Sequence, residues 1–159
     1  ATAPHAGLRV AMVRYFTIFG PRQRPDLAIH KFARLMLAGE PLALYGDGSQ
    51  ARDYTFVSDA VAGTLAAADW TADGPAAVEA FNVGGNRPIA ITEVVEALAT
   101  ALGITPRPAW EPLPPGDVER TSADLAKSGR VLGYRPAVSF EDGIRMFGDW
   151  CREVYGSQR

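Results

Sequence analysis

The stretch LRVAMVRYFTIFG, residues 8–20, decides which fold class the sequence favours. Apolar residues fill it with few breaks, which is typical of a strand buried on both faces in a parallel sheet. Gly20-Pro21 marks its end. Such a strand needs packed layers on both sides, and little of the sequence precedes it. We therefore predict an α/β protein whose sheet is completed by something outside this sequence.

Short helices and strands follow this opening strand. Apolar residues at helical spacing predict a helix that Gly39 terminates. Two strands are predicted at 42–45 and 54–57, and the Gly46-Asp47-Gly48 segment between them is a turn signal. Ser58 or Asp59 is the expected N-cap of the Ala-rich helix that comes next.

The second half of the sequence continues in short pieces. Thr92 is the expected N-cap of a helix over 93–102. Residues 104–116 hold five prolines, which predicts an extended loop or an edge strand. A short helix is predicted over 124–132, and Ser139 has the position of the cap of the last helix. No long βαβ alternation is present, so the sequence predicts a mixed α/β architecture rather than a complete doubly wound domain.

Composition excludes several classes of function. The net charge of −2 does not favour nucleic acid as a partner. No apolar run approaches the roughly 20 residues of a membrane span, so we expect no membrane partner. The single cysteine permits no disulfide within the chain, which favours the cytoplasm. Two histidines and one cysteine give no cluster with metal-ligand spacing, so no metal site is predicted.

Polar residues gather at the end of the opening strand. Thr17 lies near that end, and Arg22 and Arg24 follow it. Ligands of open α/β sheets bind at such strand ends, so these residues are candidates for a binding site. The alternative is a solvated loop in which Arg24 pairs with Asp26.

The segment GDGSQARDY, residues 46–54, is a second candidate. A glycine-rich turn followed by Arg52 can bring backbone N–H groups and a guanidinium to a phosphate. The alternative is an ordinary hairpin in which Arg52 and Asp53 are exposed.

The segment PGDVERTSAD, residues 115–124, is the third candidate. Asp117 can accept hydrogen bonds from ribose hydroxyls, and Arg120 can bind a phosphate. The alternative is a loop in which Ser122 or Asp124 caps the next helix. By contrast, the glycines of FNVGG, residues 81–85, precede a strand-like run, so we interpret this segment as a turn and not as a dinucleotide loop.

Five segments in this order resemble the C-terminal half of the NAD-dependent sugar-nucleotide epimerases and dehydratases, which are extended short-chain dehydrogenase/reductases. The matching segments are RYFTIFGPRQRPD (14–26), LYGDGSQARDYTFVSDAV (44–61), FNVGG (81–85), PGDVERTSADLAKSGRVLGYRP (115–136) and FEDGIRMFGDW (140–150). The resemblance implies that residues 1–20 end a dinucleotide-binding sheet and that residues 21–159 form a sugar-nucleotide-binding domain. It also implies NAD as cofactor of the complete enzyme, a UDP-sugar substrate, and a homodimer.

The resemblance assigns roles to individual residues. Arg52 and Arg120 match arginines that bind the diphosphate, whereas Asp117 matches a position close to the ribose. Tyr45, at the end of its strand, would lie beside the base. Two convergent arginines suit a sugar diphosphate because charge-assisted hydrogen bonds to an anion are strong.

Further positions concern the sugar and the cofactor. Tyr15 and Phe16 would line the nicotinamide end of the cofactor site. Thr17 and Arg24 match positions that approach the sugar carboxylate in uronic-acid 4-epimerases. The resemblance therefore favours action on UDP-glucuronate, with UDP-glucose 4-epimerases and related dehydratases as alternatives.

The sequence departs from this family in its catalytic parts. It contains no Tyr-x-x-x-Lys and no Gly-x-x-Gly-x-x-Gly loop, which in the family supply proton transfer and NAD binding. We therefore expect this chain alone to lack catalytic residues, to be inactive and to bind no NAD, because an N-terminal Rossmann half is missing. One alternative is a non-catalytic module that binds a nucleotide or a protein. Association through an uncovered strand is compatible with either.

Overall fold

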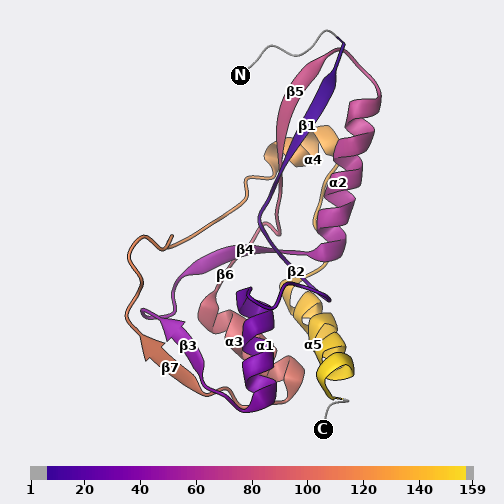
Figure 1. Ribbon diagram of the computed structural model, residues 1–159. Coiled ribbons are helices and arrows are strands. Elements are labelled where there is room, and N and C mark those ends of the chain that lie inside the picture. Colours follow the sequence, from indigo (N-terminus) through magenta and orange to yellow (C-terminus); the bar gives the residue numbers. More distant parts are fainter. Residues whose placement is uncertain (1–6, 157–159) are drawn as a thin grey trace.

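The computed structural model describes residues 7–156, which form two groups of elements; strand β4 of the second group runs directly into helix α2 of the first (Figure 1). The first group holds a parallel pair of strands with two helices packed on it. Its elements are β1 (Arg9–Tyr15), β5 (Ala77–Val83), α2 (Val57–Ala72) and α4 (Ala126–Leu132). The packing of α2 on β1 and of α4 on β5 keeps this group together.

The second group combines two small sheets with three helices. One sheet has the order β2-β4-β6, in which β2 is parallel and β6 antiparallel to β4, and the other is the parallel pair β3-β7. The strands are β2 (Thr17–Phe19), β3 (Leu42–Tyr45), β4 (Ala51–Phe56), β6 (Pro88–Ala90) and β7 (Pro108–Glu111). The helices are α1 (Ala28–Ala38), α3 (Ile91–Leu102) and α5 (Phe140–Gly156). The predicted α/β class with mixed short strands and helices is confirmed.

The main core lies in the second group, between its helices and the β2-β4-β6 sheet. Phe19 and Phe147 are fully buried there, and Phe19 packs edge-on against Phe56 with 5.5 Å between ring centroids. A smaller cluster around Val83 and Tyr134 lies in the first group. Burial of such large side chains stabilises the fold by roughly 1.5–3 kcal/mol each.

The opening strand departs from the prediction in two ways. It divides at Phe16, whose backbone N–H donates to the carbonyl of Val83, so that β1 pairs with β5 and β2 pairs with β4. Within residues 7–156, β1 is not buried on both faces, because Met12 and Tyr15 are 48% and 46% exposed; that a layer outside this sequence covers the strand stays a prediction. Helices α2 and α4 pack on this strand pair, but they do not cover the side chains of Met12 and Tyr15 from solvent.

Two of the predicted helix caps are also wrong. Neither Ser58 nor Asp59 caps α2, which begins at Val57 directly after β4. Thr92 does not cap α3, because α3 already begins at Ile91 after β6. The carboxylate of Glu93 instead accepts the N–H of Ala90 at 3.0 Å. In both places a strand passes into a helix without a loop, and local capping patterns do not anticipate such a junction.

Other local predictions are confirmed. Gly39, Gly103 and Gly133 end their helices in the left-handed conformation, which costs glycine little. The proline-rich segment 104–116 does contain an edge strand, β7. The predicted hairpin alternative at 46–48 is wrong, because β3 pairs with β7 and not with β4. No helix among residues 7–156 is long and apolar enough to cross a membrane.

Candidate functional site

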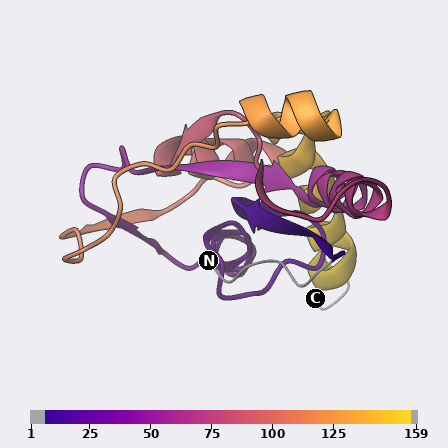
Figure 2. The same ribbon diagram turned by 90° about the horizontal axis from the view of Figure 1, so that it is seen from above.

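Strand β4 carries the central residues of the candidate site. Successive side chains of a strand point to opposite faces, so Arg52 and Tyr54 lie on one face and Asp53 on the other. Arg52 and Tyr54 line a cavity, whereas Asp53 is fully buried. The loop over residues 112–120 lies at the end of β4 away from α2 in both ribbon views (Figures 1 and 2).

The cavity has a volume of about 270 Å³ and lies between α1, β3, β4 and that loop. It brings together three of the predicted site residues, Tyr45, Arg52 and Asp117. The full lining consists of Asp26, Ala28, Lys31, Phe32, Ala43, Leu44, Tyr45, Gln50, Arg52, Tyr54, Ile91 and Asp117. An apolar floor with a few convergent charged groups is the usual composition of a small-molecule site.

Arg52 is the best-connected charged group of the cavity. Its Nη2 donates to Asp117 Oδ1 at 2.6 Å, and its Nη1 donates to the backbone carbonyls of Val118 and Ala51. The side chains of Arg52 and Asp117 are 25% and 40% exposed, so solvent weakens their attraction to about 1 kcal/mol or less. Arg52 is therefore held at the cavity by contacts that an anionic ligand can replace.

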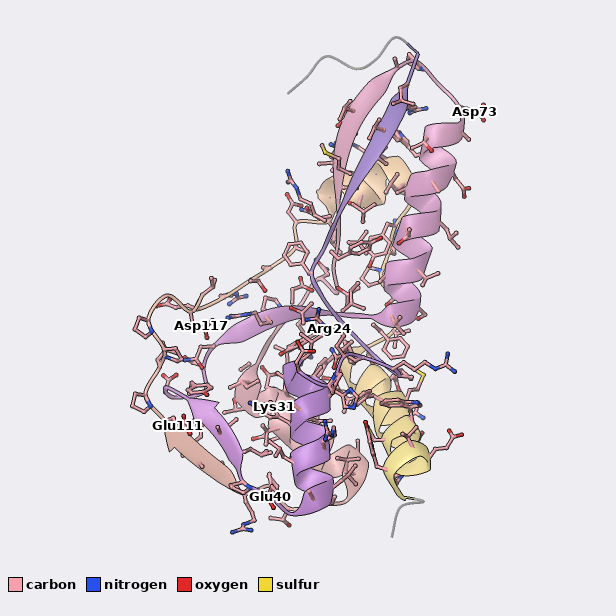
Figure 3. The ribbon with its side chains drawn as sticks, in the orientation of Figure 1. Arg24, Lys31, Glu40, Asp73, Glu111 and Asp117 are labelled. Atoms are coloured by element: carbon pink, nitrogen blue, oxygen red, sulfur yellow. The ribbon has the colours of Figure 1, made fainter. Side chains whose placement is uncertain are left out.

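Tyrosines and a lysine complete the polar lining. Burial raises the pKa of Tyr54 to about 12, so its phenol is neutral at physiological pH. Tyr45 is 37% exposed at the end of β3 and can pack against a planar ligand. Lys31 extends from α1, and Figure 3 shows it on the α1 side of the site while Asp117 lies on the loop.

Arg120 lies beside this cavity rather than in its lining. It lines a neighbouring cavity of about 480 Å³ together with Asp47, Ser49 and Leu113. The two cavities share Gln50, and Arg120 is bridged to Ala51 next to Arg52 in the sequence. The Asp47 carboxylate accepts the Ser49 hydroxyl and N–H, which lowers its pKa and keeps it charged.

Of the two predicted sugar-binding residues, Thr17 lies in β2 and Arg24 lies in the loop that follows β2. Thr17 begins β2 and lies opposite Tyr54 in the register with β4. Arg24 is exposed and pairs with Asp26 at 2.9 Å, as the alternative interpretation of this loop expects. Because Asp26 lines the cavity, this ion pair puts Arg24 beside it; Figure 3 shows Arg24 near the N-terminus of α1.

The predicted cofactor-binding residues lie where the chain changes sheets. The Tyr15 hydroxyl is 2.7 Å from Thr64 Oγ1 of α2, and Phe16 joins β1 to β2. Neither lines the cavity that holds Arg52. Their assignment to the nicotinamide stays a prediction.

Asp53 holds the two loops that flank β4. Its carboxylate accepts the N–H of Gly85 at 2.6 Å and the N–H of Ala123 at 2.9 Å, while Thr121 Oγ1 accepts the N–H of Asp53. A Cβ on Gly85 would lie 2.0 Å from the Tyr54 carbonyl, so only glycine fits this approach. This buried anchor fixes the chain that continues from Asp117 and Arg120, and no local sequence pattern predicted it.

Several lining residues were also missed. Gln50 and Tyr54 have the same parity as Arg52, so strand alternation was a usable signal for them. Lys31 and Asp26 belong to a segment distant in sequence, and no local pattern links them to β4. Among residues 7–156, no group of three or more His, Cys, Asp or Glu is placed to hold a metal ion.

Comparison with known proteins identifies relatives of this chain. The model of the NAD dependent epimerase/dehydratase family matches residues 1–84. A UDP-glucuronate 4-epimerase from Thermodesulfobacterium geofontis is 34% identical over 148 residues, covering 92% of this chain and 44% of that protein. The chain thus spans about half the length of the curated relatives it matches.

Solved structures agree with this result. The chain is similar to UDP-glucuronic acid 4-epimerase from Bacillus cereus in complex with UDP-glucuronic acid and NAD, with a TM-score of 0.83 and 35% identity. That similarity covers 91% of this chain and 46% of the other. The UDP-glucose 4-epimerase of Thermotoga maritima with UDP-glucose gives a TM-score of 0.81 and 31% identity, covering 91% and 46%.

Proposed function

The chain belongs to the NAD-dependent epimerase/dehydratase family, and from this membership we propose that it binds the UDP-sugar substrate of a 4-epimerase. The single observation that carries the proposal is the cavity in which Arg52 meets Tyr45 and Asp117. A guanidinium suits the diphosphate, a carboxylate suits the ribose hydroxyls, and an aromatic ring suits the base.

The cavity supports substrate binding rather than bond-making chemistry. Binding energy from the nucleotide, which does not react, positions the sugar, and positioning is a large part of catalysis. Arg120 would act from the neighbouring cavity on the same diphosphate, because Ala51 ties it to the strand that carries Arg52. The division of the chain at residue 20 into sheet and substrate domain stays part of this proposal.

UDP-glucuronate is the substrate that we favour. Arg24 offers a cation for the sugar carboxylate, with Thr17 at the start of the neighbouring strand. Its ion pair with Asp26 is exposed, so a carboxylate can replace Asp26 at low cost. UDP-glucose is the second candidate, since the structurally similar Thermotoga maritima enzyme was solved with that ligand.

Binding by calorimetry tests the site. We expect UDP and UDP-glucuronate to bind the chain, and Arg52→Ala to weaken both by about 10-fold or more, because a charge-assisted hydrogen bond is lost. Arg130→Ala on α4 is the matched control and should bind as the unmodified chain does. Equal affinity of the Arg52→Ala variant would refute the assignment of this cavity.

Discrimination between sugars tests the substrate. Arg24→Ala should weaken UDP-glucuronate and leave UDP-glucose and UDP unchanged. A parallel loss for all three ligands would instead place Arg24 outside the sugar site.

The complete reaction requires groups that this sequence does not contain. We propose that NAD and the proton-transfer residues act from an additional Rossmann half, since no Tyr-x-x-x-Lys or dinucleotide glycine loop occurs in the sequence. Incubation of the chain with NAD and either UDP-sugar should then give no epimer. Measured turnover would contradict this part of the proposal while leaving the binding site intact.

A further inference from the structure

We infer that Asp117 is a specificity-determining residue that competes with the ligand's diphosphate for Arg52 and thereby selects nucleoside diphosphates over bare anions. This inference rests on the proposed function and concerns the same cavity. It follows from the observation that the phosphate-binding arginine is already paired with an anion of the protein itself.

The contact geometry shows what Asp117 replaces. Its Oδ1 lies 2.6 Å from Arg52 Nη2, which is the distance of a charge-assisted hydrogen bond to a carboxylate or a phosphate. The Val118 carbonyl occupies Nη1 in the same way. Two of the acceptors around this guanidinium therefore come from the 112–120 loop, where a diphosphate would place its oxygens.

The 112–120 loop can lose the contact between Asp117 and Arg52 without losing its backbone anchors. Residues 111–120 are all exposed, and the loop is anchored where the Glu119 carbonyl accepts the Ala51 N–H and Thr121 donates back to Ala51. Those anchors are backbone contacts that persist if Asp117 turns away. The partly exposed ion pair is weak enough for a ligand to displace it.

The consequence differs between two kinds of anion. Inorganic pyrophosphate must displace Asp117 and then lies beside an unpaired carboxylate, which repels it. A nucleoside diphosphate also displaces Asp117, but its ribose hydroxyls can donate to the freed carboxylate. Only the nucleotide offsets the lost ion pair, so Asp117 makes the cavity selective for ligands that carry a ribose.

Calorimetric titration of the full chain with sodium pyrophosphate and with UDP tests this competition. We expect Asp117→Asn to bind pyrophosphate about two- to five-fold more tightly, which corresponds to the loss of one exposed ion pair. The same variant should bind UDP no more tightly than the unmodified chain. The ratio of its UDP affinity to its pyrophosphate affinity should therefore fall. Glu111→Gln, which removes one charge at the other end of the loop, is the control and should change neither affinity.

Three other outcomes would contradict parts of this inference or the proposed function beneath it. Unchanged or weaker pyrophosphate binding by Asp117→Asn would overturn the competition, and would indicate that Asp117 only holds Arg52 in place. An equal gain for pyrophosphate and UDP would overturn the selectivity. If the unmodified chain binds neither ligand, the proposed function fails. In that case the competition can still be tested. If Asp117→Asn binds pyrophosphate and Glu111→Gln does not, the competition is supported. If neither variant binds pyrophosphate, the competition is overturned.

Discussion

Adjacent residues of β4 lie in different environments because the successive side chains of a strand point to opposite faces. Arg52 faces a cavity with solvent access, and Asp53 faces the interior, where it is fully buried. A buried carboxylate is tolerated only when hydrogen bonds satisfy it, and Gly85 and Ala123 provide two. The contacts of Asp53 therefore fix the strand that presents Arg52 to the cavity.

Asp53→Asn should be strongly destabilising. One amide oxygen replaces two carboxylate acceptors, and the amide NH2 group would face a backbone N–H in the interior. We expect the free energy of unfolding to fall by about 2–4 kcal/mol, measured by urea denaturation. Asp69→Asn on the exposed side of α2 is the control. A loss below 0.5 kcal/mol, taken as roughly the usual range for surface substitutions, would show that the anchor is dispensable.

Cys151 gives a second prediction at the residue scale. Burial raises the pKa of its thiol to about 12, from an ordinary value of about 9. Only the thiolate reacts readily, so iodoacetamide at pH 8 should modify the chain only as it unfolds in urea. Rapid alkylation of the folded chain would contradict the buried position.

The sign of the pH effect follows from the direction of the same shift. Because the folded pKa of Cys151 lies above the unfolded value, the contribution of the neutral thiol to stability is fully present below the unfolded pKa. It is lost as the pH rises toward 12.

The last helix shows how an element depends on its first turn. Ser139 Oγ accepts the N–H of Asp142 at 3.0 Å and donates to the Asp142 carboxylate at 2.8 Å. The hydrogen bond from Ser139, followed by that from Arg145, lowers the pKa of Asp142. The predicted capping pattern is thus present at α5.

Ser139→Ala should destabilise the chain by about 1 kcal/mol at pH 7. A lowered folded pKa contributes stability above the unfolded pKa of about 3.9 and loses it as the pH falls through the folded value. The difference between variant and unmodified chain should therefore shrink in denaturation experiments at pH 3. Ser58→Ala, at the predicted cap that is not one, should have little effect at either pH.

Helices α1 and α5 are joined by a buried histidine. His30 Nδ1 lies 2.5 Å from the Gln23 carbonyl, and Nε2 lies 2.7 Å from the Tyr155 hydroxyl. A carbonyl can only accept, so Nδ1 donates to Gln23, and Nε2 shares the second hydrogen bond with the Tyr155 hydroxyl. This chain of contacts ties the loop that holds Arg24 to the C-terminal helix.

Tyr155→Phe should therefore lower the free energy of unfolding by about 1–2 kcal/mol, because Nε2 of His30 loses its hydrogen-bond partner in the interior. Tyr15→Phe removes a hydroxyl whose bond to Thr64 is exposed, and it should cost less. Thermal denaturation of both variants provides the comparison. Equal losses of unfolding free energy would show that the buried hydrogen bond of Tyr155 stabilises the fold no more than the exposed one of Tyr15.

At the scale of the whole molecule, the β1-β5 group leaves large apolar side chains open. Leu65 and Val61 are 60% and 52% exposed on one face of α2, and Met12 is 48% exposed on β1. Large apolar side chains exposed on α2 and on β1 offer surfaces through which two copies of the chain can associate. We expect the chain to self-associate as its concentration rises.

Analytical ultracentrifugation measures this association. Met12→Lys and Leu65→Lys should each shift the chain toward monomer, because a charge at either position opposes burial of that side chain in an association contact. Val131→Lys, at an exposed apolar position of α4, should leave the association unchanged. A monomeric unmodified chain at high concentration would contradict the prediction.

Local sequence patterns predicted the features that depend on neighbours along the chain. Helix ends at Gly39 and Gly103, the cap at Ser139 and the edge strand in the proline-rich segment all follow from residues within a few positions of each other. Arg52 and Asp117 were recognisable as candidates because residue type and resemblance identified them without knowledge of their distance.

The contacts between distant segments follow from tertiary packing and not from local patterns. Phe16 divides the opening strand because Val83, far along the chain, takes its N–H, and β3 pairs with β7 instead of forming the expected hairpin. The pairing of Arg52 with Asp117 across 65 residues is of the same kind. Strand pairing and charge contacts depend on which surfaces pack together in three dimensions, and that free energy belongs to the folded chain as a whole and not to any local pattern.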